Sequence, residues 1–347
     1  MRVILTGHLG YIGSAMAPML LEAGHEVVGL DTGLFAACVL GPTPQDPDGL
    51  TTDIRDVRTD QLAGFDAVIH LAALSNDPLG MLDPALTHEI NYDATVRLAR
   101  LAREAGVKRF LYASTCSVYG TAGDELVPES APLRPLTPYA ESKVRVEEDL
   151  FALADSDFCP VSLRNATAFG FSPRLRADIV LNNLVGHAVL SGEVRVLSDG
   201  TPWRPLVHVS DIGRAFLTVL DAPTESVRAV AFNVGAPDNN LSVAQIAAHV
   251  ADAVPGSRVV ITGEAGPDLR SYRVDVSKLP ATVPAYRAEW SVPAGAAELA
   301  AAYQSFGLDQ AQFEGRFVRL AHLQKRLAAG SLAADLRPRA PETVDQV

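Results

Sequence analysis

Three glycines near the N-terminus constrain the fold of this chain more than any other feature. Gly7, Gly10 and Gly13 directly follow a short apolar run, Val3 to Leu5, and open a segment whose apolar residues recur at helical spacing. Glycines at such a position allow a tight turn from strand to helix and a close approach of the backbone to a pyrophosphate. Their GxxGxxG spacing is one residue wider than the common GxGxxG. The chain therefore begins with a predicted βαβ unit that binds a dinucleotide.

Asp31 supports this interpretation. It ends the second apolar run, Val27 to Leu30, and follows Gly13 by 18 residues, close to the spacing of about 20 expected for a carboxylate that binds a ribose. Such a carboxylate accepts hydrogen bonds from ribose hydroxyls and repels a 2′-phosphate, which favours NAD over NADP. The alternative is that Asp31 is a turn residue at the end of a strand.

The alternation of short apolar runs with amphipathic segments continues through the first half. It predicts an α/β fold, a doubly wound, Rossmann-type parallel sheet. Further expected strands are Ala67–Leu71, Phe110–Ala113 and Val161–Leu163. We expect an NAD-binding domain over residues 1–165.

After residue 165 the pattern becomes irregular and predicts a smaller α+β lobe over residues 166–328, with segments that can return to the first domain. A helix is expected over Ile179–Leu190, strands over Val194–Leu197 and Leu206–Val209, and a second helix after the capping box that Ser242 opens. Residues 329–347 are rich in small, charged and proline residues, which predicts a flexible tail.

Composition excludes several classes of protein. The net charge of −12 without a basic patch argues against binding to nucleic acid. Cys38, Cys116 and Cys159 lack the spacing of a disulfide framework or a zinc site, so no metal is expected. No apolar run is long enough for a signal peptide or a membrane span, so we expect a cytoplasmic protein without a membrane partner.

A second chemical signal is the pair Tyr139 and Lys143. The two residues are four apart, so on a helix they share one face. A lysine cation and an oxidised nicotinamide would both favour the phenolate, which would make Tyr139 a general base. The alternative is a surface helix with two amphipathic side chains. Hydroxyls from Ser114 onward follow an expected strand, and Thr115 could bond a substrate oxygen there.

These motifs, taken in order, resemble those of the extended short-chain dehydrogenases/reductases, specifically the NAD-dependent nucleotide-sugar epimerase/dehydratase family, over roughly residues 1 to 305. The resemblance implies that Thr115, Tyr139 and Lys143 are catalytic and that Lys143 also holds the nicotinamide ribose. It implies a cofactor site made of Gly7, Gly10, Tyr11, Ile12, Gly13, Asp31, Asp53, Ile54, Leu71, Ala72, Ala73, Ser75, Tyr139 and Lys143.

The resemblance also implies a nucleotide-diphosphate sugar as substrate and a homodimer formed through the helix with Tyr139 and the helix after Asp83. Arg204 and Arg270 would clamp the diphosphate, since a guanidinium meets phosphate oxygens bidentately. Surface ion pairing is the alternative for both. The full expected substrate set is Cys116, Ser117, Asn165, Thr167, Asn183, Arg204 and Arg270.

The motif after Thr115 narrows the expected reaction. Related 4,6-dehydratases carry an Asp-Glu pair there, whereas this chain has Cys116 and Ser117, closer to the small uncharged residues of UDP-galactose 4-epimerases. Cys116 is either a buried small side chain or an acid/base group. Thr167 stands where the family usually has an asparagine, and Asn165 could compensate. We expect an NAD-dependent epimerase that oxidises the sugar transiently at C4. The alternatives are an NAD(P)H-dependent 4-ketoreductase or dehydrogenase of an activated deoxysugar, and a non-catalytic NAD sensor.

Overall fold

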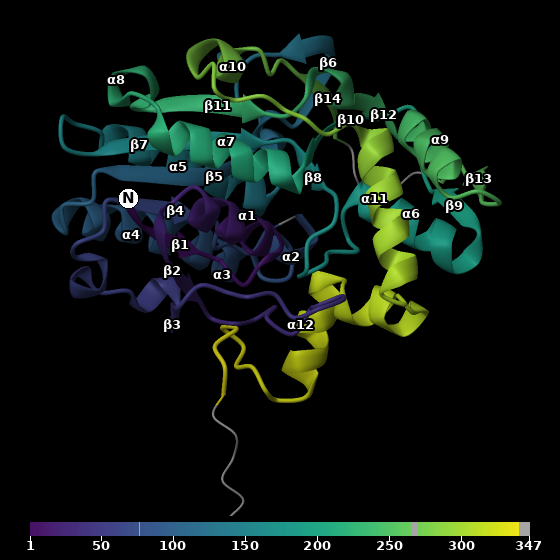
Figure 1. Ribbon diagram of the computed structural model, residues 1–347, viewed down its shortest axis with the longest axis horizontal. Coiled ribbons are helices and arrows are strands. Elements are labelled where there is room, and N and C mark those ends of the chain that lie inside the picture. Colours follow the sequence, from purple (N-terminus) through teal and green to yellow (C-terminus); the bar gives the residue numbers. More distant parts are fainter. Residues whose placement is uncertain (76, 265–269, 340–347) are drawn as a thin grey trace, which may run out of the picture.

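A seven-stranded, all-parallel sheet forms the centre of the computed structural model, which describes residues 1–75, 77–264 and 270–339 (Figure 1). The strand order is β11-β7-β5-β4-β1-β2-β3. This order confirms the doubly wound fold that the sequence predicts. The strands are β1 (Arg2–Thr6), β2 (Glu26–Asp31), β3 (Gly49–Thr51), β4 (Ala67–His70), β5 (Arg109–Thr115), β7 (Cys159–Asn165) and β11 (Val230–Val234).

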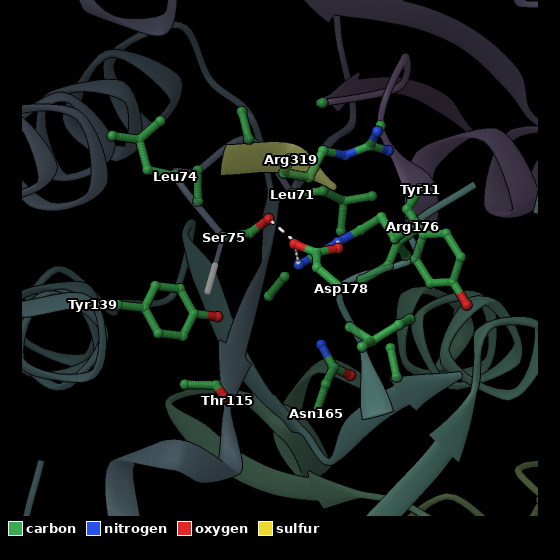
Figure 2. A pocket seen from close by; sticks show the side chains of 18 of the residues that line it. Tyr11, Leu71, Leu74, Ser75, Thr115, Tyr139, Asn165, Arg176, Asp178 and Arg319 are labelled. Carbon is green, nitrogen blue, oxygen red and sulfur yellow. Dashed lines mark hydrogen bonds and ion pairs between the residues drawn. The ribbon is translucent and has the colours of Figure 1, made fainter. Parts of the chain in front are cut away.

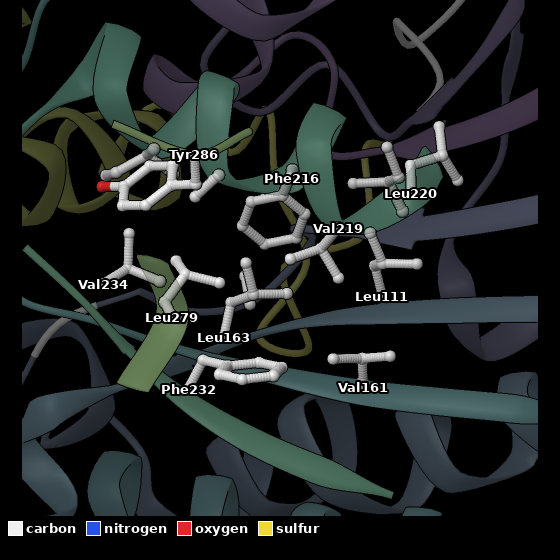
Figure 3. Packing of buried hydrophobic residues seen from close by; sticks show 14 of the residues in the cluster. Leu111, Val161, Leu163, Phe216, Val219, Leu220, Phe232, Val234, Leu279 and Tyr286 are labelled. Carbon is white, nitrogen blue, oxygen red and sulfur yellow. The ribbon is translucent and has the colours of Figure 1, made fainter. Parts of the chain in front are cut away.

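Helices cover both faces of this sheet because its strands are apolar on both sides. On one face α1 (Tyr11–Glu22) packs against α7 (Val209–Asp221), and Figure 3 shows Phe216 and Val219 of α7 over Leu111 and Val161. On the other face lie α4 (Ala94–Glu104) and α5 (Pro138–Ala152), with α2 (Asp77–Gly80) and α3 (Pro84–His88) near α5. Successive side chains of β5 point to opposite faces of the sheet. Phe110 packs in the apolar core on the α4 and α5 face, and Leu111 packs in the core on the α1 and α7 face.

The second lobe contains a separate apolar core and small sheets. Its three-stranded sheet has the order β12-β10-β8, and β13 pairs with β9. A further two-stranded sheet pairs β14 with β6. The strands are β6 (Thr121–Val127), β8 (Thr167–Phe169), β9 (Glu193–Val196), β10 (Trp203–His208), β12 (Asn240–Ser242), β13 (Arg258–Ile261) and β14 (Ser271–Val274). The helices of this lobe are α6 (Val180–Ser191), α9 (Val243–Ala253) and α11 (Val292–Ser305). The short helices α8 (Thr224–Val227) and α10 (Lys278–Thr282) pack instead on β7 and β11 of the central sheet.

Most expected elements of this lobe are present with shifted ends. The expected strand at 206–209 is β10, which begins three residues earlier, and Ser242 with Gln245 forms the expected capping box of α9. The strand β11 returns to the central sheet beside β7, so the second half of the chain completes the first domain. Within the described ranges, no helix has the length and apolar character needed to span a membrane.

The C-terminal segment corrects one expectation. After α12 (Arg319–Ala328), residues 329–339 pack on the first domain instead of forming a flexible tail. Leu332 and Leu336 are each 2% exposed and belong to the core beneath β2 and β4. Asp56 pairs with Arg337. Two leucines in a polar stretch are thus enough to anchor the segment, and residues 340–347 lie outside the described part of the chain.

Candidate functional site

A cavity of about 690 Å³ opens at the carboxyl ends of the central strands, the edge at which parallel sheets of this type bind ligands. It is lined by loops after β1, β2, β4 and β5, by the start of α5 and by residues of the second lobe. Among the predicted site residues, those that line it are Gly7, Gly10, Tyr11, Ile12, Gly13, Asp31, Asp53, Ile54, Leu71, Ala72, Ala73, Ser75, Thr115, Ser117, Tyr139, Lys143, Asn165, Thr167, Asn183, Arg204 and Arg270.

Cys116 is the exception and requires a correction. Its side chain is fully buried, and it is absent from the described residues that line the cavity. The thiol donates to the carbonyl oxygen of Arg164 at 3.0 Å, and burial raises its pKa. Cys116 opens the 3-10 helix Cys116–Tyr119, whose tight turn directs neighbouring side chains to different sides. Cys116 is therefore a small core residue and does not contact a ligand in this cavity.

The glycine loop has the close contacts that a phosphate loop needs. Gly7 has a φ of +75°, and a Cβ there would lie 2.8 Å from the amide nitrogen of Ala72. A Cβ on Gly13 would lie 2.3 Å from the carbonyl oxygen of Gly7. Gly10 is the N-cap of α1, and no side chain of the described residues caps this helix. Its first N–H groups are thus available to an anion.

We predict that Gly13→Ala weakens NAD binding by at least about tenfold and destabilises the fold by about 1 to 3 kcal/mol, because the loop must move to accommodate the Cβ. Calorimetric titration with NAD and thermal unfolding measure the two effects. Gly315→Ala is the matched control, since no atom lies within 4 Å of its added Cβ. Equal NAD affinity in Gly13→Ala and the wild type would contradict the assignment of this loop to the cofactor.

Asp31 lines the cavity at the end of β2. Its carboxylate accepts hydrogen bonds from the amide of Leu9 at 3.1 Å and of Gly33 at 2.8 Å, which fixes it at the end of β2. Burial raises its pKa, and the two amide bonds and His8 oppose that rise. Asp53 is held in a similar way, since it caps the short helix Ile54–Asp56 and pairs with Arg55 at 2.7 Å.

Thr115, Tyr139 and Lys143 come together at the middle of the cavity. Thr137 caps α5 by accepting from the amide of Ala140, and the helix then presents Tyr139 and Lys143 one turn apart. Figure 2 shows the Tyr139 phenol and the Thr115 side chain on the same side of the pocket. The Lys143 ammonium donates to the carbonyl oxygen of Ala113 at 2.7 Å and lies 5.6 Å from the Tyr139 ring centroid.

The protonation of this pair differs from the sequence-based expectation. Burial raises the pKa of Tyr139 to about 12, and Asp77 adds to the rise, while Thr115, Arg176 and Arg270 oppose it. Burial lowers the pKa of Lys143 to about 7. The guanidinium groups of Arg176 and Arg270 therefore favour the phenolate of Tyr139.

A buried ion pair lies behind the cavity wall that carries Thr115 and Lys143. Glu147 of α5 pairs with Arg164 of β7 at 2.6 Å and accepts a hydrogen bond from Ser114 of β5. The pair thus ties together the three elements that carry Lys143, Thr115 and Asn165. The Asn165 amide nitrogen donates to the carbonyl oxygen of Ser114 at 3.4 Å, whereas its Oδ1 has no hydrogen-bond partner among the described residues. A buried acceptor in this position is suited to a ligand hydroxyl.

Arg270 and Arg204 contact each other where the second lobe lines the cavity. Arg270 pairs with Asp77 at 2.6 Å and donates to the Ser117 hydroxyl at 3.0 Å, while Arg204 donates to the carbonyl oxygen of Arg270. Asn76, Asp268 and Leu269 lie outside the described residues. Asn183 donates to the carbonyl oxygen of Ala177 and lines the same cavity.

Sequence reasoning missed several charged residues that line the cavity, among them Asp77, Arg176, Asp178 and Arg319. Arg176 pairs with Asp178 at 3.0 Å inside the cavity, and Asp77 contributes a carboxylate near Tyr139. Arg319 reaches the cavity from α12. Asp77 follows the predicted cofactor residue Ser75 by only two positions, so it lies in a segment that the sequence analysis had partly assigned to the site. The other three residues had no local signal.

Comparison with known proteins identifies relatives that match about two thirds or more of this chain. The model of the "NAD dependent epimerase/dehydratase family" matches residues 3–235. A UDP-glucose 4-epimerase of Mycolicibacterium smegmatis is 32% identical over 265 residues, which cover 69% of this chain and 84% of the relative. A UDP-glucose 4-epimerase of Corynebacterium glutamicum is 28% identical over 71% of this chain and 78% of the relative.

Solved structures agree with this relationship. MoeE5, determined in complex with UDP-glucose and NAD, is 29% identical, with a TM-score of 0.74 over 88% of this chain and 99% of that protein. A UDP-glucose 4-epimerase of Thermotoga maritima has a TM-score of 0.76 over 89% of this chain and 100% of its own. Its identity of 22% supports the shared fold alone.

Proposed function

This chain belongs to the NAD-dependent epimerase/dehydratase family, and from that premise we propose that it is a nucleotide-sugar 4-epimerase. The main support is the set of groups around Tyr139: a hydroxyl on Thr115, a hydroxyl on Ser117 and no Asp-Glu pair after Thr115. Asp77 is the carboxylate that raises the pKa of Tyr139 most. It forms an ion pair with Arg270 and accepts a hydrogen bond from the Thr137 hydroxyl. A carboxyl group that is held by an arginine and a hydroxyl donor is poorly suited to protonate a leaving hydroxyl.

The cavity residues fit NAD. The glycine loop and the N-terminus of α1 suit its pyrophosphate, and Asp31 suits its adenosine ribose. When bound, NAD accepts a hydride from the sugar and later returns it. Lys143 lines the same cavity, and its ammonium donates to the carbonyl oxygen of Ala113. We propose that this ammonium also donates a hydrogen bond to the nicotinamide ribose of bound NAD.

Tyr139 is the proposed proton carrier. Its phenolate takes the proton of the C4 hydroxyl while the C4 hydride leaves, and the phenol returns that proton after the hydride has been added to the opposite face. Thr115 donates a hydrogen bond to the same sugar oxygen. A phenol with a raised pKa needs positive charge to ionise, and Arg176 and Arg270 already lower the pKa of Tyr139. The cycle consumes no external oxidant, because the sugar is oxidised and then reduced.

The substrate is proposed to bind with its diphosphate on Arg204 and Arg270. Binding would require Arg270 to exchange at least part of its contact with Asp77 for phosphate oxygens. The free Oδ1 of Asn165 would accept a hydrogen bond from a sugar hydroxyl. We also propose a homodimer through α3 and α5, because Met81 and Leu136, which flank these helices, are 59% and 53% exposed.

An isotope experiment tests the activity. The purified protein is denatured and its released nucleotides are identified, and native protein is incubated with UDP-glucose deuterated at C4 without added cofactor. We expect near-stoichiometric NAD and UDP-galactose that retains the deuterium. UDP-glucuronate and UDP-N-acetylglucosamine, each deuterated at C4, extend the same test to other sugars. Oxidation of added NADPH by a nucleotide 4-keto-6-deoxysugar, with reduction of its keto group to a hydroxyl and no conversion of the three substrates above, would favour the ketoreductase. Bound NAD without turnover of any of these three substrates would contradict the 4-epimerase proposal.

A further inference from the structure

Arg319 is a buried cation in the cavity that the proposed catalytic steps do not use. It is the first residue of α12 and is 2% exposed, yet it lines the cavity. Figure 2 shows it at the same end of the pocket as Tyr11 and Leu71, away from Thr115 and Asn165. The family model ends at residue 235, so this side chain comes from a part of the chain that the model does not match.

The guanidinium is only partly satisfied by the protein. Its Nη2 donates to the carbonyl oxygen of Arg174 at 3.1 Å, and its Cζ lies 4.5 Å from the centre of the Phe35 ring. Its Nη1 is buried without a hydrogen-bond partner among the described residues, and none of their carboxylates forms an ion pair with it. The buried Cys38 side chain lies near the guanidinium and favours the cation, but a thiol carries no full negative charge to balance it. Burial lowers the pKa of Arg319 to about 10, so it is still a cation at neutral pH.

A buried charge with a free donor is costly unless something else pairs with it. Arg176 adds a second positive charge nearby, and this charge lowers the pKa of Arg319 further. Asp178 offsets part of this charge, but it is already paired with Arg176. This end of the cavity therefore carries more cationic donors than the described protein groups satisfy. An anion that enters the cavity would supply the missing partner.

The position of Arg319 indicates which anion this is. Arg174, whose carbonyl oxygen accepts from Arg319, also donates to the Ser14 hydroxyl in the first turns of α1 at 2.9 Å. Arg319 thus lies beside the N-terminal end of the helix that follows the glycine loop. Phe35, on which it stacks, belongs to the loop after β2, on the cofactor side. The diphosphate of a sugar nucleotide would lie elsewhere, near Arg204 and Arg270.

We propose that Arg319 binds the pyrophosphate of NAD, so that the C-terminal helix α12 completes the cofactor site. The free Nη1 donates to a phosphate oxygen opposite the N–H groups of α1, and the anion is held from two sides. This inference depends on the NAD dependence of the family and not on the epimerase activity, because binding alone tests it.

Arg319→Met tests this role, since it keeps an unbranched apolar chain and removes the charge. We expect NAD and ADP-ribose to bind about 10- to 100-fold more weakly, the range for the loss of a charge-assisted hydrogen bond. Adenosine, which has no pyrophosphate, is expected to bind as it does to the wild type. Calorimetry on protein stripped of nucleotide measures all three. Lys325→Met, an exposed lysine on the same helix, is the matched control and should leave every affinity unchanged.

Two outcomes would overturn the proposal. Unchanged affinity for ADP-ribose together with a lower melting temperature would make Arg319 a structural residue. A loss of affinity for UDP, with NAD unaffected, would assign Arg319 to the substrate diphosphate. If Arg319→Met does not fold, Arg319→Lys gives the same comparison. A single ammonium lacks the planar fork of the guanidinium, so ADP-ribose should bind several-fold more weakly while adenosine does not.

Discussion

Tyr139→Phe is expected to lower turnover by about 10²- to 10⁴-fold, the usual contribution of a positioned general acid/base. The phenol lines the cavity, where partial burial raises its pKa, and its oxygen is the group that would exchange a proton with the C4 hydroxyl. The ring remains in the variant, so the packing at the start of α5 is preserved and the affinity for NAD should change by less than about twofold. Turnover is measured with saturating sugar nucleotide, and NAD binding by calorimetry.

Tyr112→Phe is the matched control for this prediction. Its hydroxyl is also buried, lies in the neighbouring strand β5 and has no hydrogen-bond partner among the described residues. The Lys143 ammonium lies 4.6 Å from its ring centre, so both tyrosines share the same surroundings. Removing the Tyr112 hydroxyl should leave turnover within about threefold and the fold equally stable. If Tyr139→Phe behaved like Tyr112→Phe, Tyr139 would not be the proton carrier.

The features that could be predicted from the sequence are those with a local physical cause. A phosphate loop needs glycines at fixed positions because its backbone atoms approach one another closely, as the Cβ distances at Gly7 and Gly13 show. The apolar strands of the central sheet were visible because both of their faces are covered. The spacing of Tyr139 and Lys143 follows from the helical repeat of α5.

Features that depend on distant parts of the chain could not be predicted in this way. Arg319 is separated from the glycine loop by about 300 residues, and on a helix with several other basic residues it had no distinguishing pattern. The packing of residues 329–339 depends on Leu332 and Leu336, two apolar residues in a polar segment. Cys116 is next to Thr115 in the sequence, but the 3-10 turn directs it into the core. Spacing alone does not indicate which way a side chain points in such a turn.

The protonation of Lys143 could not be predicted either, because the pKa of a lysine depends on its burial. The sequence suggested a permanent cation beside Tyr139. In the structure, Lys143 is 3% exposed and packs against the Tyr112 ring, and its pKa falls to about 7. Its charge in the ligand-free protein therefore changes within the physiological pH range. This property leads to a second large expected effect.

Lys143→Met is expected to abolish turnover and yet stabilise the nucleotide-free protein, by up to about 4 kcal/mol at pH 7. An unfolded lysine has a pKa of about 10.4, whereas the folded pKa is about 7. The unfolded state thus binds a proton that the folded state releases, and this difference opposes folding. The cost is largest below pH 7 and declines as the pH rises toward the unfolded pKa, so at about pH 9.5 the gain should be only about 1 kcal/mol.

Denaturant unfolding of the wild type and of Lys143→Met at the two pH values measures this difference, because the other titrating groups are common to both proteins. Lys325→Met is again the matched control, since an exposed lysine should change the free energy of unfolding by less than about 0.5 kcal/mol at either pH. A gain of equal size at both pH values would mean that the methionine merely packs better. A loss of stability at pH 7 would mean that the Ala113 hydrogen bond outweighs the cost of burying the ammonium. In either case Lys143 would not be the destabilised, buried cation that we infer.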